Sequence, residues 1–106
     1  MLSLALLQMP ASAHSPTDII CQYDQTAKAL DVKIMHNTAR VHDHYVRTLQ
    51  IYQNDKLFKE FTYQWQKNKL YVEETVDISI GSTDVIKVVA IDNHGGTKEL
   101  FLDQSK

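Results

Sequence analysis

Residues 36–52 read HNTARVHDHYVRTLQIY, and the fold of the chain is decided around this stretch. Its second half alternates between two sides, of which Tyr45, Leu49 and Ile51 form one and Val46, Gln50 and Tyr52 the other. Period-two alternation is typical of a β-strand with one buried face. The first half carries three of the five histidines, His36, His42 and His44. The stretch therefore predicts a histidine-bearing loop that leads into a core strand.

The remainder of the chain repeats this pattern of short alternating segments separated by turn residues. We predict seven strands, at residues 17–23, 30–35, 45–53, 57–65, 70–80, 85–92 and 97–102. Apolar residues nowhere recur at helical spacing over a useful length. The pattern favours an all-β fold, an immunoglobulin-like seven-stranded antiparallel β-sandwich. Its inner faces are expected to carry Leu30, Val32, Ile34, Leu49, Ile51, Val76, Ile78, Val88 and Ala90.

Composition limits the classes of protein to which the chain can belong. A length of 106 residues suits one small domain, and 43% hydrophobic with 23% charged residues is an ordinary globular balance. A formal net charge of −2 gives no reason to expect a nucleic acid as partner. The single cysteine, Cys21, excludes an intramolecular disulfide.

The first thirteen residues differ from the rest. A short apolar run, MLSLALLQM, precedes Ala11-Ser12-Ala13, a small-x-small pattern followed by His14. We interpret residues 1–13 as the remnant of a signal peptide and residues 14–106 as the mature domain, periplasmic or secreted. The alternative is an apolar N-terminal segment of a cytosolic protein. The run is too short to span a bilayer as a helix.

A second loop, Asp92-Asn93-His94-Gly95-Gly96, follows the most β-rich stretch of the chain. In a sandwich of this strand order it is expected at the same end as the loop that holds His36 and His44. Imidazole and carboxylate groups that converge there could bind a metal ion. The alternative is that these histidines are solvated loop residues, because short motifs often match by chance.

The two loops resemble those of the superoxide reductase-like family, the ferrous-iron domain of desulfoferrodoxin. The similarity runs from about Ile19 to Leu100. It rests on the segment from His36 to His44-Tyr45-Val46 with the following TLQIY, and on Val88-Val89-Ala90-Ile91-Asp92-Asn93-His94-Gly95. The resemblance implies a seven-stranded immunoglobulin-like sandwich and an iron held by four histidines and one axial cysteine.

Matched by position, the resemblance assigns His36, His44 and His94 as metal ligands, with His14 as the N-terminal histidine and His42 as an extra candidate. Asp92 stands where the family has its cysteine. A carboxylate is a harder donor than a thiolate and shifts both potential and metal preference. Iron is therefore the expected cofactor, with copper or zinc as alternatives. Superoxide reduction is expected to be slow or absent.

Two functions from different classes remain. The first is an exported metal-binding domain, a superoxide reductase-like oxidoreductase where active, served by a redox partner protein. The second is a metal-free immunoglobulin-like binding or carrier module whose loops hold a protein or a small molecule. The fold alone does not choose between them. Metal content of the purified mature chain distinguishes the two.

Overall fold

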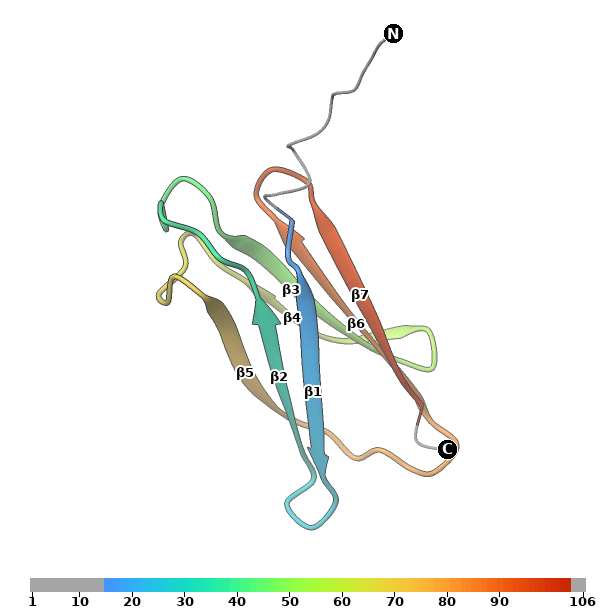
Figure 1. Cartoon of the computed structure of the whole chain (residues 1–106). Helices are drawn as coiled ribbons and strands as arrows, with labels where there is room; N and C mark the ends of the chain where they lie inside the picture. Colours follow the sequence, from blue (N-terminus) through green and yellow to red (C-terminus); the bar gives the residue numbers. More distant parts are fainter. Residues whose placement is uncertain (1–14, 104–106) are drawn as a thin grey trace, which may run out of the picture.

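The computed structural model describes residues 15–103, which form seven strands in two layers (Figure 1). In chain order the strands are β1 (Asp18–Asp24), β2 (Ala29–Met35), β3 (Val46–Gln53), β4 (Lys56–Thr62), β5 (Tyr71–Asp77), β6 (Val85–Asp92) and β7 (Thr97–Asp103). Within these residues no helix is long and apolar enough to cross a membrane. The predicted cleavage site and His14 lie outside the described residues.

The strands form two antiparallel sheets that pack face to face. One sheet has three strands in the order β1-β2-β5, and the other has four in the order β4-β3-β6-β7. β1 and β7 contact each other along one side of the sandwich. β5 and β4 are the remaining edge strands. This arrangement confirms the predicted seven-stranded antiparallel β-sandwich.

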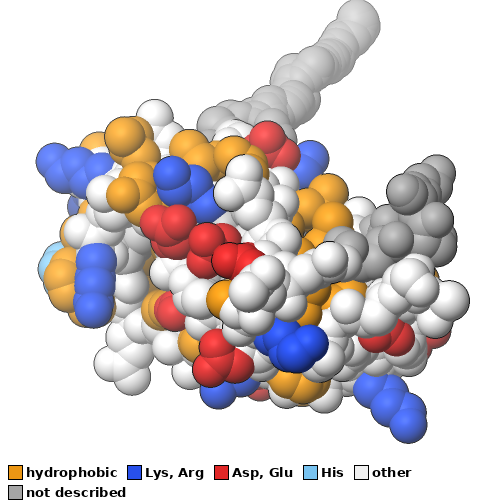
Figure 2. All heavy atoms as spheres, turned by 90° about the horizontal axis from the view of Figure 1, so that it is seen from below, with side chains coloured by type: hydrophobic (Ala, Val, Ile, Leu, Met, Phe, Trp, Pro, Cys, Tyr) orange, Lys and Arg blue, Asp and Glu red, His pale blue; other side chains and the backbone are white. Residues whose placement is uncertain are grey.

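The core lies between the two sheets and is aliphatic. All nine residues predicted for the inner faces are buried, with exposed fractions of at most 3%. Ile19, Val46, Ile80 and Ile86 complete the same cluster. Because the strands alternate, their opposite faces remain available to solvent. Viewed from below Figure 1, lysine, arginine and acidic side chains are mixed with hydrophobic ones over the surface (Figure 2).

One predicted side assignment is wrong. Val46 was expected on the face opposite Leu49 and Ile51, yet all three are fully buried. The pairing of β3 with β6 shifts register between Val46 and Thr48. A bulge of this kind inserts an extra residue and re-aims the side chains before it. The irregularity therefore turns Val46 inward, and period-two counting cannot foresee it.

Two predicted strands are too long. β4 ends at Thr62 rather than at residue 65, and Trp65, which lies within the predicted strand, is 42% exposed. β5 ends at Asp77, although Ile78 and Ile80 beyond it remain buried. Alternation of side chains continues past the last ladder hydrogen bond, so the pattern overestimates the length of the strand.

Candidate metal centre

Three segments that are distant in the sequence meet at one end of the sandwich. They are the loop from β2 to β3, the loop from β6 to β7 and the segment between β4 and β5 (Figure 1). The first two are tied directly: Asn93 N–H donates to the carbonyl of Tyr45 at 2.9 Å, and Tyr45 N–H donates to Asn93 Oδ1 at 3.0 Å. The prediction that both histidine-bearing loops lie at the same end is therefore confirmed.

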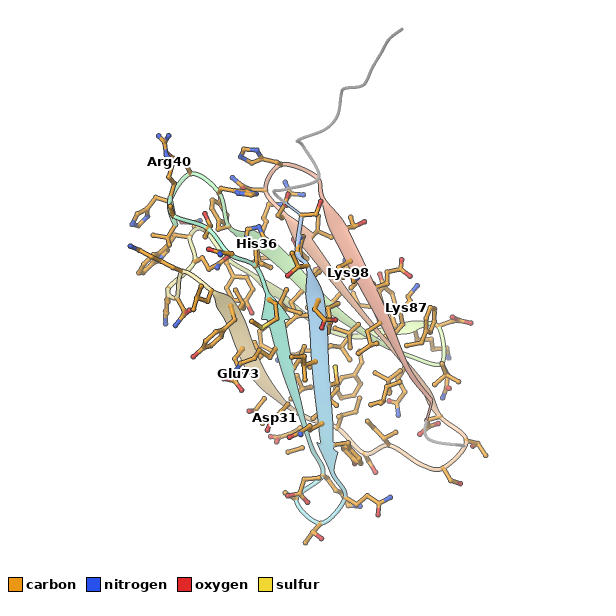
Figure 3. The ribbon with its side chains drawn as sticks, in the orientation of Figure 1. Asp31, His36, Arg40, Glu73, Lys87 and Lys98 are labelled. Atoms are coloured by element: carbon orange, nitrogen blue, oxygen red, sulfur yellow. The ribbon has the colours of Figure 1, made fainter. Side chains whose placement is uncertain are left out.

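His36 follows the last residue of β2 and is held inside the molecule. Its side chain is 1% exposed. Its backbone N–H donates to the carbonyl of Leu70 at 2.9 Å. Its ring Nδ1 lies 2.8 Å from Gln66 Oε1, and its Nε2 lies 3.8 Å from Asp92 Oδ2. In Figure 3 His36 lies at the end of β2, whereas Arg40 projects from the outer tip of the same loop.

Asp92 is the last residue of β6, and its carboxylate is fully buried. Oδ1 accepts the backbone N–H groups of His94 at 2.8 Å and Gly96 at 2.9 Å. Oδ2 points toward the histidines, 3.5 Å from His44 Nε2 and 3.8 Å from His36 Nε2. The loop from β6 to β7 thus orients the carboxylate and leaves one oxygen for the centre of the cluster.

Gly96 makes this close approach possible. A Cβ at position 96 would lie 2.8 Å from Asp92 Oδ2 and would also collide with Ser15. Contacts this short essentially do not occur for real side chains. Glycine at this position therefore lets the loop from β6 to β7 close over the carboxylate.

His44 and His94 extend the group toward the surface. The His44 ring is 4.6 Å from the His36 ring and 4.6 Å from the His94 ring, measured between centroids. His44 is 7% exposed, whereas His94 is exposed. His94 Nε2 donates to the carbonyl of Asp43 at 3.2 Å. His94 therefore lies at the rim of the cluster, and its role as a ligand stays a prediction.

His36, His44 and Asp92 together form a cluster that could hold a metal ion. Each offers one ligand atom, and these atoms all lie within 4.8 Å of one another. Ligand atoms of one ion with bonds of about 2.1 Å lie roughly 3 Å apart, so the 3.5 and 3.8 Å separations at Asp92 are close to that requirement. Two imidazoles and a carboxylate suit divalent transition metals, including iron and zinc. The donor set fits.

His42 does not join this cluster. Its ring stacks on the indole of Trp65, with centroids 4.8 Å apart and planes inclined by 13°. Both side chains are exposed. The side chains of His42 and His44 would point the same way only in extended backbone, but residues 41–44 form a turn in which His44 N–H donates to the carbonyl of Arg40. The turn separates the two imidazoles.

Gln66 is a residue of the site that sequence patterning missed. It sits in the irregular segment between β4 and β5 and is 1% exposed. Its side chain contacts His36 through both ring and backbone. Alternation marks this segment only as a break between strands, so nothing in the pattern shows that one of its polar residues is buried.

A groove of about 570 Å³ runs beside this segment. Its lining residues include three aromatic side chains, those of Tyr63, Trp65 and Tyr71, and the acidic Glu73 and Glu74. The groove lies outside the histidine cluster but shares Gln66 with it. It is an open surface feature at the edges of β4 and β5.

Comparison with solved structures places this fold. A single-site variant of the superoxide reductase (neelaredoxin) from Ignicoccus hospitalis superposes with a TM-score of 0.52 at 15% identity, covering 87% of this chain and 79% of the other. The unsubstituted protein from the same organism gives a TM-score of 0.51 at 16% identity, covering 84% and 77%. No family model and no curated protein matches the sequence. The chain therefore has a superoxide reductase-like fold.

Proposed function

We propose that this domain binds a divalent metal ion, with iron favoured and zinc or copper as alternatives, through His36, His44 and Asp92. The observation that carries the proposal is the buried convergence of three ligand atoms within 4.8 Å. A buried carboxylate is costly unless a cation or hydrogen-bond donors compensate it. Asp92 Oδ1 receives two backbone N–H groups. A metal ion at the histidines would compensate Oδ2.

The chemistry of such a centre follows from its ligands. A bound iron would supply one-electron redox chemistry, and the two solved structures compared above are superoxide reductases. In this chain His36 and His44 would hold the ion as neutral donors, and Asp92 would partly neutralise its charge. A carboxylate donates less electron density than a thiolate. We therefore expect slow superoxide reduction or none, and an iron form without thiolate-to-iron colour.

Export and partners belong to the same proposal. The apolar run before Ala11-Ser12-Ala13 supports a periplasmic or secreted location, with the mature chain beginning at His14. His14 and His94 are the proposed additional ligands. A redox partner protein is needed only where the centre exchanges electrons. N-terminal sequencing of the protein from its native host is expected to begin at His14, and an intact Met1 would contradict export.

A titration tests the metal site. The mature chain is freed of metal with a chelator and titrated with ferrous iron, zinc and copper, beside a His36→Ala/His44→Ala double variant and a matched His42→Ala variant. Wild type and His42→Ala are expected to bind one ion and to melt at higher temperature when loaded, because ligand bound only to the folded state stabilises it. Affinity is expected to fall with acid, since protons compete for imidazole nitrogen. Equal binding by the double variant would exclude the site.

The second candidate function, a metal-free binding module, is favoured by one observation. The groove at Tyr63, Trp65 and Tyr71 exposes aromatic surface of the kind that pockets for small molecules use. The same titration separates the two functions, because a binding module takes up no stoichiometric ion. The histidine cluster favours the metal-binding function, since its ligand atoms are buried whereas the groove is open.

A further inference from the structure

Gln66 is a buried amide that joins three segments at the histidine cluster. Its Oε1 lies 2.8 Å from His36 Nδ1 and accepts the N–H of Val46 at 3.2 Å. Its Nε2 donates to the carbonyls of His36 and Asn68, both at 2.8 Å. Every hydrogen-bonding position of the amide group is thus used by a partner from the surrounding segments.

These partners determine which way round the amide lies. The two backbone carbonyls can only accept hydrogen bonds, so the group that faces them must be the NH₂. The amide oxygen must then face the Val46 N–H and the His36 ring. An amide oxygen only accepts, so His36 Nδ1 must carry a proton and donate it. If the amide oxygen and nitrogen were exchanged, the oxygen would face two carbonyl oxygens, which cannot donate. The NH₂ group would face the Val46 N–H, which cannot accept.

The geometry points to Gln66 as the positioning residue that sets the tautomer of His36. With the proton held on Nδ1, a neutral His36 ring has its lone pair on Nε2. That nitrogen lies 3.8 Å from Asp92 Oδ2, on the side of the ligand cluster. Gln66 also anchors the backbone of the same residue through its carbonyl. Ring orientation and ligand atom are therefore set together, before any ion arrives.

The role given to Gln66 rests on the proposed metal site, but the tautomer of His36 can be measured without a metal. Ligand histidines in proteins almost always donate their second ring N–H to a carboxylate, a carbonyl or water, and loss of that partner costs about 10–100-fold in metal affinity. Gln66 supplies this partner through an uncharged amide. An uncharged acceptor polarises the ring less than a carboxylate does, so His36 keeps neutral-imidazole character as a ligand.

The direct measurement is the tautomer of His36 in metal-free, ¹⁵N-labelled protein, read from two-bond nitrogen–proton correlations at alkaline pH. We expect the proton on Nδ1 in wild type. In Gln66→Leu we expect the proton to be released to Nε2 or shared, and zinc affinity to fall about 10–100-fold. Gln64→Leu is the matched control: Gln64 is exposed, two residues away, and should change neither reading.

Gln66→Glu keeps an acceptor oxygen beside Nδ1, so we expect the wild-type tautomer there. Its carboxylate has no N–H, so the two hydrogen bonds to the carbonyls of His36 and Asn68 are lost. A wild-type proton on Nε2 overturns the inference whether or not any variant folds. So does a Gln66→Leu protein with an unchanged tautomer and zinc affinity within about 2-fold of wild type. If the tautomer responds as expected but no protein binds zinc, the positioning role stands and the metal function fails. If wild type binds zinc tightly and the tautomer is the same in Gln66→Leu, the metal function stands and the positioning role fails.

Discussion

Asp92 divides its two oxygens between the loop and the cluster. Oδ1 closes the turn by accepting two backbone N–H groups, and Oδ2 faces two histidines. Because the two oxygens have different partners, a substitution can remove the role of one and keep that of the other. Asparagine preserves the first oxygen and replaces the second by an NH₂ group, which can donate to imidazole nitrogen.

Asp92→Asn is expected to weaken metal binding without a large loss of stability in the metal-free protein. Zinc affinity should fall by more than the roughly 10–100-fold that follows loss of an outer hydrogen-bond partner, because the anionic ligand itself is lost. Stability in the presence of chelator should stay within about 1 kcal/mol of wild type or rise, since a buried charge is removed. Calorimetric titration and urea unfolding measure the two quantities. Unchanged zinc affinity would exclude Asp92 as a ligand.

At the scale of single elements, β2 and β3 each contribute three fully buried aliphatic side chains to the space between the sheets. Ile34 on β2 and Ile51 on β3 are both fully buried and belong to the same aliphatic cluster. Each lies on a strand that is paired on both sides. Neither strand can shift to fill a void without breaking its pairing with two neighbours.

Truncation of Ile34 or Ile51 to alanine is therefore expected to lower the free energy of unfolding by about 2–5 kcal/mol. Ile20→Ala is the matched control, because Ile20 is 47% exposed on the outer face of β1. Its free energy of unfolding should stay within about 0.5 kcal/mol of wild type. Urea denaturation at pH 7 measures all three. A loss below about 1 kcal/mol at both core positions would contradict the inner-face assignment.

The strands were predictable because each of them alternates, and the turns because they use residues that suit them. Asn54 and Asp55 both have positive φ, 51° and 69°, as the two-residue hairpin turn between β3 and β4 requires. Features that depend on pairing between strands were not predictable. The bulge beside Val46 is visible only in the register of β3 against β6.

The candidate site was predictable in part for the same reason. His36, His44 and Asp92 each lie within two residues of a strand end, so the predicted strands bring them to one end of the sandwich. The stacking of His42 on Trp65 and the burial of Gln66 depend on how irregular loops pack. No periodicity in the sequence reports such packing.

At the scale of the whole molecule, a side-chain hydrogen bond links the two sheets along the side where β4 and β5 are the edge strands. Tyr63, just after β4, donates its hydroxyl to Glu74 Oε2 on β5 at 2.7 Å. Burial raises the pKa of Tyr63, and the hydrogen bond to Glu74 raises that pKa further. The folded state therefore holds the phenolic proton more tightly than the unfolded chain does.

The contribution of this bond should depend on pH with a defined sign. A folded pKa above the unfolded value of about 10 means that the stabilisation is complete below pH 10 and is lost as pH rises beyond it. Tyr63→Phe is expected to lower the free energy of unfolding at pH 7 by about 1–2 kcal/mol. The gap to wild type should narrow between about pH 10 and 11. Urea unfolding of both proteins across this range measures it, and a gap that stays constant would contradict the assignment.

The two-sheet order also leaves four strand edges, which bears on how copies of this chain meet one another. Edge strands have unpaired backbone groups with which a strand of a second polypeptide can pair. Here β4 carries Lys56, Lys59 and Glu60, β5 carries Glu73 and Glu74, and β7 carries Lys98 and Glu99. The register of β4 against β3 also shifts between Ile51 and Tyr52. An incoming strand at β4, β5 or β7 would thus meet charged side chains, and at β4 also an irregular edge, both of which disfavour edge-to-edge pairing of copies.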